Sequence, residues 1–485
     1  MAVGIVPAYQ SPLVHELFAR QSPVALLPNL ATSANPANGF DPTRLENGTE
    51  VRWVPNPAMM GIPFGARVSA LWEHGLGLVA FRNLEKQVVG GIYLHSAIRN
   101  PWSQVAEGAF QCLGGIMVFP NEGTGSKNAE DLFADVVSKG EAMCPKWQFH
   151  RINAQAEGVL ADPRLGGGKS TASHPATEQG KKDAIAVTAA VASALGIYIS
   201  GSDQNMTAEN CGQFASLAPR NFMGVNGHPL ALYAGMGDPS PWTAKGVYFA
   251  IRAAREKLLN GETEPVFIQG YGNVGRPLTD MLVRDGHPIS GIIDTNLAML
   301  IRAREAGLNC PLYFLDTGAG LPDAAALERH NVKVVKNMVE ALERHPETTI
   351  LSPNAGTHLI TLDVASYLVN SKVRTIIGAA NNMLDVVDGS VEVIANMLQN
   401  AKIFVPNDSE TNQMGALSVV VRPLGLTEEQ LMRLAQGVGA RTYEAIELFY
   451  QNIAPQIGRA RIARRFYNQL LASGEAVGGY YVNAA

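Results

Sequence analysis

The chain has 485 residues, of which 46% are hydrophobic and 17% are charged, and its formal net charge is -5. This length exceeds one ordinary core and predicts two domains, while the weak charge gives no reason to expect a nucleic-acid partner. No basic start leads into a long apolar run, and no apolar stretch reaches about 18 residues, so we expect a cytoplasmic protein without membrane contact. The four cysteines, which predict free thiols and no metal site, are Cys112, Cys144, Cys211 and Cys310.

The first part of the chain divides in two by composition. Residues 1–74 carry many prolines, asparagines and glycines, which predicts an irregular N-terminal extension with little regular structure. Residues 75–235 mix strand-like runs such as LGLVAF and GGIMVF with helical periodicity in NAEDLFADVVSKGEAM. We therefore predict an α/β substrate domain over residues 75–235.

Two segments of this domain carry chemistry. The LGGGKS segment places Lys169 after three glycines, where the backbone can pack close to a ligand and hold an amine that acts on water beside a carbonyl. It is not a Walker loop, because Pro163 stands where that motif needs glycine. Asp203 follows an apolar strand, at a loop where a carboxylate can serve as acid or base. The alternatives are a surface lysine on a flexible turn and a turn-forming or capping aspartate.

The third and fourth parts of the chain complete the fold class. Residues 236–425 begin with an amphipathic helix and continue with short apolar strands separated by helices, which predicts a doubly wound parallel sheet. The predicted strands are VFIQG, ISGIID, TTILSP, RTIIGAA and KIFVP. Residues 426–485 have helical spacing, and we expect these helices to pack back on the substrate domain or to form an oligomer interface. The predicted fold is thus α/β, with a substrate domain and a Rossmann nucleotide-binding domain separated by a cleft.

Residues 265–296 have the order strand, glycine-rich turn, helix, strand and acid that a dinucleotide-binding unit requires. Gly270 allows the tight turn, Gly272 lets a pyrophosphate approach the backbone, and Gly275 lets the helix pack against the strand. Asp294 ends the second strand, where a carboxylate hydrogen-bonds the ribose hydroxyls and repels a 2′-phosphate. The segment therefore predicts NAD as the cofactor, and the alternative is a structural turn without a ligand.

Polar loops follow several strands of the nucleotide domain. They include GDPSPWTAKGVY, GAANNML and PNDSETNQMGA, and ligands of open α/β sheets bind at such strand ends. Asn381 and Asn382 lie in the second of these loops, where their amides could hydrogen-bond a ribose or an amide group. The alternative for both asparagines is a simple turn.

Seven motifs occur together in one order, namely LGGGKS, SGSD, GDPSPWTAKGVY, GYGNVG, IIDTN, GAANNM and TNQMGA. In this order they resemble the glutamate, leucine, phenylalanine and valine dehydrogenase family. The resemblance covers roughly residues 75–470 and is nearest to the leucine and phenylalanine branch, whose nucleotide domain also begins with a Gly-Asx-Pro-Ser-Pro-x-Thr helix.

The resemblance assigns roles to individual residues. It implies that Lys169 activates water and stabilises a carbinolamine, and that Asp203 carries protons to and from the substrate amine. The substrate-binding positions that it implies are Gly114, Gly115, Lys146, Asn382 and Asn412. The cofactor-binding positions that it implies are Thr243, Gly270, Gly272, Asn273, Val274, Gly275, Asp294, Thr295, Ala380 and Asn381.

One position departs from the family pattern. The family has a second lysine, which binds the substrate α-carboxylate, twelve residues before the glycine-rich lysine, and the same count from Lys169 reaches Glu157. A glutamate in a poorly solvated cleft would repel an α-carboxylate. If residues 147–157 are instead an insertion, Lys146 becomes this carboxylate-binding lysine. We favour the insertion, because the preceding helix has the family pattern and ends in the right place.

These observations predict reversible, NAD-dependent oxidative deamination of an apolar or aromatic L-amino acid to a 2-oxo acid and ammonia. We expect a small-molecule substrate, no nucleic-acid or membrane partner, and a homo-oligomer. One alternative is reductive amination or imine reduction of a specialised substrate of secondary metabolism, which Glu157 and the N-terminal extension would suit. Another is a catalytically inactive nucleotide-binding homologue.

Overall fold

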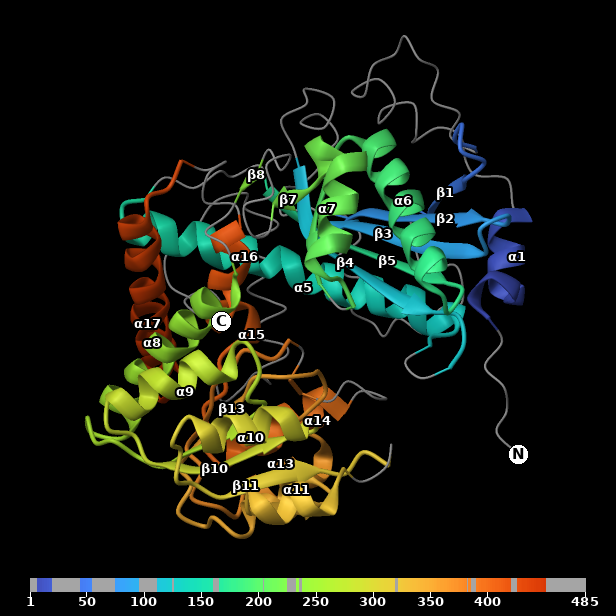
Figure 1. The fold of residues 1–485 in the computed structure, drawn as a ribbon. Helices are drawn as coiled ribbons and strands as arrows, with labels where there is room; N and C mark the ends of the chain where they lie inside the picture. Colours follow the sequence, from blue (N-terminus) through green and yellow to red (C-terminus); the bar gives the residue numbers. More distant parts are fainter. Residues whose placement is uncertain are drawn as a thin grey trace.

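The computed structural model describes most of the chain outside its two ends. The described residues are 7–19, 44–54, 75–95, 111–123, 126–159, 165–203, 205–224, 233–234, 238–318, 322–381, 383–384, 390–419 and 425–450. They form two α/β units, each built on its own six-stranded sheet (Figure 1). The α/β fold with two domains is therefore confirmed. No described helix is long and apolar enough to span a membrane.

The first sheet is mixed, with the strand order β1-β2-β3-β5-β4-β6. Its strands are β1 (Glu50–Val54), β2 (Gly75–Asn83), β3 (Val88–His95), β4 (Gln111–Pro120), β5 (Leu165–His174) and β6 (Tyr198–Ser202). Strands β5, β4 and β6 are parallel neighbours, so their carboxyl ends share one edge. Helix α5 (Ala129–Ala156) covers one face of this sheet, whereas α6 (Glu178–Leu195) and α7 (Ala208–Leu217) cover the other (Figure 1).

The prediction of an irregular N-terminal extension is wrong for the parts of residues 1–74 that the structure describes. Helix α1 (Pro12–Ala19), preceded by the short turn η1 (Ala8–Gln10), buries Val14 and Phe18 in the same core as α5. Strand β1 pairs antiparallel with β2 along its whole length. These elements are short and lie between Pro- and Asn-rich stretches, so composition averaged over the segment concealed them.

The second sheet is parallel throughout, with the order β12-β11-β10-β9-β13-β14 that a doubly wound domain requires. Its strands are β9 (Val266–Gln269), β10 (Ile289–Asp294), β11 (Leu312–Leu315), β12 (Val332–Val335), β13 (Ile350–Pro353) and β14 (Thr375–Ile376). Our sequence reading did not identify the short strands β11 and β12. The expected strand at KIFVP is reduced to one bridge between Thr375 and Phe404.

Short helices connect the strands of this second sheet. They are α9 (Gly275–Arg284), α10 (Leu297–Glu305), α11 (Ala324–Arg329), α12 (Met338–Leu342), α13 (Leu362–Leu368), α14 (Ser390–Asn400), α15 (Asp408–Thr411) and α16 (Gln413–Val419). The order in which strands are added to the sheet reverses at β9, because β10 to β12 lie on one side of it and β13 and β14 lie on the other. Ligands of such sheets bind outside the strand ends at this switch point.

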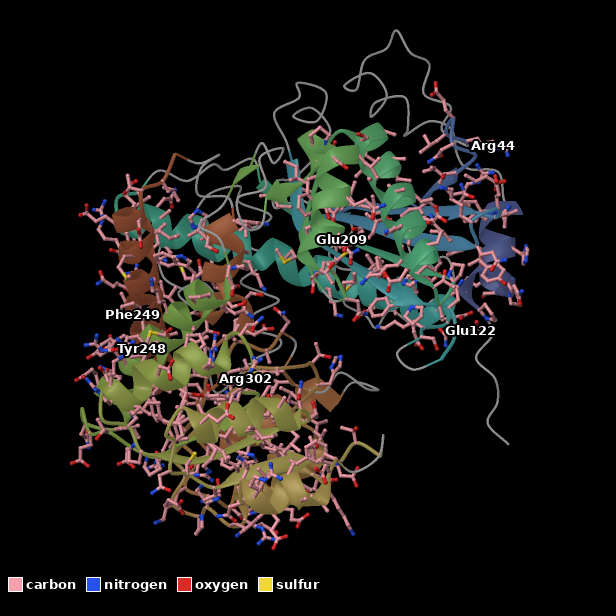
Figure 2. All side chains as sticks on the ribbon, viewed as in Figure 1. Arg44, Glu122, Glu209, Tyr248, Phe249 and Arg302 are labelled. Carbon is pink, nitrogen blue, oxygen red and sulfur yellow. The ribbon has the colours of Figure 1, made fainter. Side chains whose placement is uncertain are left out.

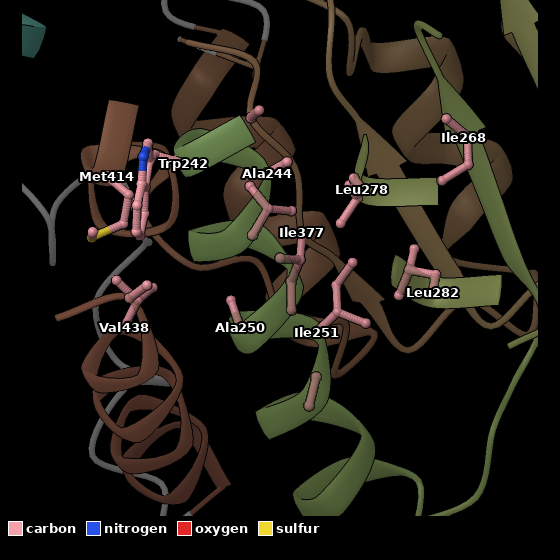
Figure 3. Packing of buried hydrophobic residues seen from close by; sticks show 14 of the residues in the cluster. Trp242, Ala244, Ala250, Ile251, Ile268, Leu278, Leu282, Ile377, Met414 and Val438 are labelled. Atoms are coloured by element: carbon pink, nitrogen blue, oxygen red, sulfur yellow. The ribbon is translucent and has the colours of Figure 1, made fainter. Parts of the chain in front are cut away.

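Two long helices join the sheets. Helix α8 (Ser240–Leu258) packs between α9 and α17 (Glu428–Tyr450) through small and branched residues. Figure 3 shows Ala250 and Ile251 of α8 and Val438 of α17 in this layer. The Asn153 amide Nδ2 of α5 donates to the Leu434 carbonyl oxygen at 2.7 Å, which ties α17 to the first domain. The junction is therefore a packed helical layer that holds the two sheets on either side of a cleft.

Candidate active site

A cleft of about 390 Å³ lies where the two sheets face each other. Its walls come from β4, β5, the end of β6 and α5 on one side, and from the start of α8, the loops after β13 and β14, and α16 on the other. The cleft therefore lies over the middle of β4 and β5 in the first sheet and at the strand ends of the second sheet, where polar loops converge.

The first wall brings Lys169 of β5 and Asp203, which follows β6, into direct contact. The Lys169 amine Nζ and the Asp203 carboxylate Oδ2 form an ion pair, and Lys169 is 8% exposed. Gly114 and Gly115 of β4 line the cleft between them. LGGGKS is thus a buried strand whose lysine faces a carboxylate, rather than a flexible surface turn.

Lys146 reaches the cleft from α5. Its Nζ donates to the Asn381 side-chain oxygen at 2.7 Å, across the cleft. Burial lowers its pKa to about 8; the nearby Asp408 carboxylate opposes this shift and the Lys169 amine adds to it. An amine in this position can bind a carboxylate ligand.

Glu157 lies elsewhere. It follows the last residue of α5, where its side chain packs near Gly437 of α17. Helix α5 is continuous through residues 147–156, so Lys146 and Glu157 are separated by about three helical turns. The structure brings Lys146, and not Glu157, to the cleft.

An asparagine pair connects the cleft to the second sheet. Asn412 Nδ2 donates to the Ala379 carbonyl oxygen and to Asn381 Oδ1, each at 3.0 Å. Asn381 Oδ1 therefore accepts from both Lys146 and Asn412. Ala380 lines the cleft beside them, and Asn382 lies outside the described residues.

Thr243 lies in the first turn of α8. Its Oγ1 donates to the Pro239 carbonyl oxygen at 3.1 Å, and the side chain lines the cleft. A Cβ added at Gly415 would lie 2.1 Å from this hydroxyl. The glycine in the TNQMGA motif therefore lets α16 approach α8 at the cleft.

The glycine-rich loop between β9 and α9 fits a dinucleotide pyrophosphate. Gly270 has φ +85, and a Cβ there would lie 2.4 Å from Ala355 Cβ, so a larger residue is excluded. A Cβ on Gly275 would lie 1.9 Å from the Gly270 carbonyl oxygen, whereas one on Gly272 would meet no atom within 4 Å. The free space at Gly272 lies beside the first turn of α9, whose unpaired N–H groups favour an anion.

Three further residues of the predicted cofactor set surround this loop. Val274 lines the cleft, and Asn273 is exposed. Thr295 is exposed at the end of β10. These positions leave Asn273 and Thr295 accessible to a ligand that spans the strand ends.

Asp294 supports the glycine-rich loop. Its Oδ2 accepts from the Tyr271 N–H and its Oδ1 from the Asn296 N–H, both at 2.8 Å. Burial raises the pKa of this carboxyl, and the backbone donors act against that shift. Asp294 therefore lies at the expected strand end and has a second role, in holding the turn, that sequence reading missed.

Two arginines of α10 follow Asp294 and differ in their contacts. Arg304 donates to the carbonyl oxygens of Leu308, Cys310 and His330 and is thereby committed to the end of α10. Arg302 is exposed on α10 (Figure 2).

Sequence reading missed several residues of the cleft. They are Lys139, Met143 and Trp147 of α5, Asn354, Gly356 and Thr357 after β13, and Ala416 and Val419 of α16. Spacings of three, four and seven residues place Lys139, Met143 and Lys146 on one helical face, which is a signal that the sequence did contain. The residues after β13 follow a predicted strand, and that position also marks them.

No metal site accompanies this cleft within the described ranges. Those residues contain no group of three His, Cys, Asp or Glu side chains that could hold a metal ion. Cys112, Cys211 and Cys310 are buried and form no disulfide, and the Cys144 side chain is not described.

Comparison with known sequences finds matches to part of the chain. Residues 235–433 match the family model described as Glutamate/Leucine/Phenylalanine/Valine dehydrogenase. A phenylalanine dehydrogenase from Lysinibacillus sphaericus is 29% identical over 179 residues, which are 36% of this chain. The aligned stretch spans 41% of the length of that relative.

Solved structures of similar fold include an L-tryptophan dehydrogenase from Nostoc punctiforme, with a TM-score of 0.54 and 17% identity over 83% of this chain and 97% of that one. A glutamate dehydrogenase from Plasmodium falciparum has a TM-score of 0.53 and 12% identity, over 97% of both chains. At such identities the likeness concerns the fold.

Proposed function

We propose that this chain is a member of the glutamate, leucine, phenylalanine and valine dehydrogenase family, whose model matches residues 235–433, and that it is an NAD-dependent amino-acid dehydrogenase. Its reaction is the reversible oxidative deamination of an apolar or aromatic L-amino acid to a 2-oxo acid and ammonia. The observation that carries the proposal is the Lys169–Asp203 ion pair, which lines the same cleft as Val274 of the glycine-rich loop. A binding protein without turnover has no need for this pair.

The substrate carboxylate binds Lys146. Below a pH of about 8 this buried amine is protonated, and a charge-assisted contact to a carboxylate contributes about 1.5 to 3 kcal/mol. An amine without a carboxylate would leave this contact unused, so the position of Lys146 favours an amino acid over an imine-reductase substrate.

Two residues move the protons. Asp203 accepts a proton from the substrate ammonium, which frees the nitrogen lone pair as the α-hydrogen leaves with its electron pair. A bound nicotinamide dinucleotide supplies the hydride acceptor. Lys169 then assists addition of water to the iminium carbon, and the resulting carbinolamine breaks its C–N bond to release ammonia. The ion pair keeps the two groups within reach of one substrate carbon.

The cleft lining supports an apolar or aromatic side chain. Met143, Trp147, Ala416 and Val419 all line the cleft, and the aligned relative is named as a phenylalanine dehydrogenase. Lys139, a further charged residue of the lining, pairs with Asp135 at 3.0 Å. The substrate side chain therefore meets mostly apolar groups.

Asp294 selects NAD over NADP in this proposal. Its carboxylate stands at the end of β10, where it accepts hydrogen bonds from the ribose and repels a 2′-phosphate. For assembly we propose a homo-oligomer. One protein of similar fold, with 16% identity and a TM-score of 0.50, is a hetero-hexameric glutamate dehydrogenase from Thermus thermophilus.

A substrate panel tests the proposed function. L-amino acids, the matching 2-oxo acids with ammonia, and amines without a carboxylate are each incubated with NAD(H) and with NADP(H), and the reduced cofactor is followed by absorbance. We expect the highest kcat/KM for an apolar or aromatic amino acid with NAD. Turnover of amines alone, or of no substrate with either cofactor, would refute the proposal.

A further inference from the structure

The sheet opens beside the Lys169 backbone. Strands β4 and β5 pair in parallel up to Leu113 opposite Gly167, and pairing resumes at Ile116 opposite Ser170. Each strand advances three residues between these pairs, so the register is unchanged but the ladder is interrupted. The β4–β5 gap contains Gly114 and Gly115, which still pair with β6 on their other side, and Gly168 and Lys169, which still pair with β3. Backbone groups that leave a buried ladder need other partners.

One tyrosine offers a donor to the β4 side of this gap. The Tyr198 hydroxyl of β6 lies 3.3 Å from the Gly114 carbonyl oxygen, 3.2 Å from that of Gly115 and 3.1 Å from Ser170 Oγ. The side chain is fully buried, and burial raises the pKa of the hydroxyl, which keeps it protonated and able to donate. A single hydroxyl thus bridges β4 and β5 where their own ladder is absent.

The Tyr198 ring packs against Gly168, which has no side chain to obstruct it. A Cβ on Gly168 would lie 2.9 Å from the ring atom Cε2 of Tyr198, so the residue before the lysine must be small for the ring to pass. A Cβ on Gly114 would lie 1.6 Å from the Gly168 carbonyl oxygen. Part of the glycine-rich LGGGKS pattern is therefore explained by packing beneath the strand, and not by contact with a ligand.

The hydroxyl lies behind the cleft. Adjacent residues of a strand point to opposite faces, so Ser170, which meets Tyr198, and Lys169, which meets Asp203, lie on opposite sides of the sheet. Tyr198 belongs to the core formed with α6 and α7, whereas the cleft opens on the side of α5. Tyr198 therefore has no direct access to a substrate.

We propose that Tyr198 is a positioning residue of the active site, which holds the opened β4–β5 segment so that the Lys169 amine stays aligned with Asp203 and with the Gly114–Gly115 floor. This inference rests on the proposed function, because it assigns the tyrosine a part in the same reaction. The hydroxyl contacts Gly114, Gly115 and Ser170, and it contacts neither Lys146 of α5 nor the glycine-rich loop before α9, so its loss should affect the alignment of Lys169 more than the binding of the substrate carboxylate or the cofactor.

Tyr198→Phe tests the role, since it keeps the ring and removes only the hydroxyl. We expect kcat to fall about tenfold through misalignment of the lysine, while KM for the amino acid and for NAD changes less than about twofold. Tyr313→Phe is the matched control. Tyr313 is equally buried, and its hydroxyl contacts His345 Nε2 at 2.7 Å in the other sheet. This control should lower the melting temperature without lowering kcat.

A second readout does not need turnover. Pyridoxal phosphate forms imines with accessible lysine amines, and borohydride trapping with peptide mass spectrometry measures the rate at Lys169. Tyr198→Phe should change this rate several-fold, and Tyr313→Phe should not. If the wild-type protein oxidises no amino acid, the proposed function fails and the labelling rate alone decides the role of Tyr198.

An unchanged kcat in Tyr198→Phe, or an unchanged labelling rate where turnover is absent, overturns the inference. A fall in kcat of equal size in Tyr313→Phe also overturns it, because the effect would then be one of general stability. Should Tyr198→Phe not fold, Ser170→Ala removes one of the three contacts of the hydroxyl and is judged by the same two measurements, with a smaller fall expected in kcat.

Discussion

The two walls of the cleft are built from different chemistry. The wall of the first domain, which we call the catalytic wall, presents charged side chains, with Lys146, Lys169 and Asp203 beside Gly114 and Gly115. The wall of the second domain, the nucleotide wall, presents the glycine-rich turn, the start of α9 and the amides of Asn381 and Asn412. The difference agrees with the proposal that one domain transfers protons and the other binds the cofactor.

The walls also differ in how far apart their parts lie in the chain. The glycine-rich turn and Asp294 lie within 25 residues of each other, from 270 to 294, and a hydrogen bond from the Tyr271 N–H to Asp294 closes that unit. The catalytic wall joins residues from position 114 to position 203 through four elements. A substitution in the glycine-rich unit should disturb only residues near it in the chain. The geometry of the catalytic wall depends instead on the register of a whole sheet.

Lys169→Ala gives the largest expected effect. Loss of the amine should reduce kcat at least about a thousandfold, because it removes the group proposed to assist water addition and breaks the ion pair with Asp203, while the Kd for NADH should stay within about twofold. Steady-state kinetics and NADH fluorescence titration measure the two quantities. Lys86→Ala, which breaks an ion pair with Asp183 of the same domain, is the control and should leave kcat unchanged. Near-native turnover by Lys169→Ala would show that the catalytic wall is wrongly assigned.

Lys146→Ala should act on substrate binding. Removal of the carboxylate contact should raise KM for the amino acid about 10- to 100-fold, which corresponds to a loss of about 1.5 to 3 kcal/mol. Glu157→Ala is the matched control on the same helix and should change KM less than about twofold, because Glu157 packs against α17. The opposite ranking of the two variants in initial-rate assays would restore Glu157 as the residue beside the substrate.

Asp294→Ser tests the nucleotide wall. Loss of the carboxylate should reduce the preference of kcat/KM for NAD over NADP about tenfold, through weaker ribose binding and relief of repulsion of the 2′-phosphate. Asp323→Ser is the control, since Asp323 also accepts a backbone N–H, that of Ala325, but caps α11. Equal use of both cofactors by the wild-type protein would mean that this strand end does not select NAD.

A rise in pH should weaken carboxylate binding at the catalytic wall and leave NADH binding at the nucleotide wall nearly unchanged. The pKa of Lys146 is lowered to about 8, so its charge is present below this pH and is lost as the pH rises through it. The inhibition constant of a simple carboxylate without an amine should therefore rise about fourfold between about pH 7 and about pH 8.5. NADH binding should change little over the same range. A carboxylate affinity that is flat with pH in wild type would contradict binding at Lys146.

The sequence predicted the nucleotide wall better than the catalytic wall. Gly270, Gly275 and Asp294 could be identified from the sequence because a βαβ unit needs specific residues at short spacing. The contact between Lys169 and Asp203 had no such local signal, since it depends on β4 lying between β5 and β6. Strand order of this kind follows from packing of the whole sheet, and no spacing along the chain encodes it.

The choice between Lys146 and Glu157 shows the same limit. Counting along the chain favoured Glu157 unless an insertion was assumed, because a count does not show where a helix ends. Helix α5 continues to Ala156, which carries Glu157 beyond the cleft and leaves Lys146 within it. The interrupted β4–β5 ladder and the Tyr198 hydroxyl beneath it likewise had no counterpart in the sequence pattern.

Isotope transfer tests most directly whether the two walls serve one reaction. The amino acid that reacts fastest is prepared with deuterium at Cα and incubated with NAD, and the mass of the reduced cofactor is measured. The account predicts one deuterium in each molecule of reduced cofactor, with none formed by Lys169→Ala. Reduced cofactor without deuterium, or its formation at an equal rate by Lys169→Ala, would contradict transfer between a substrate on the catalytic wall and a nicotinamide on the nucleotide wall.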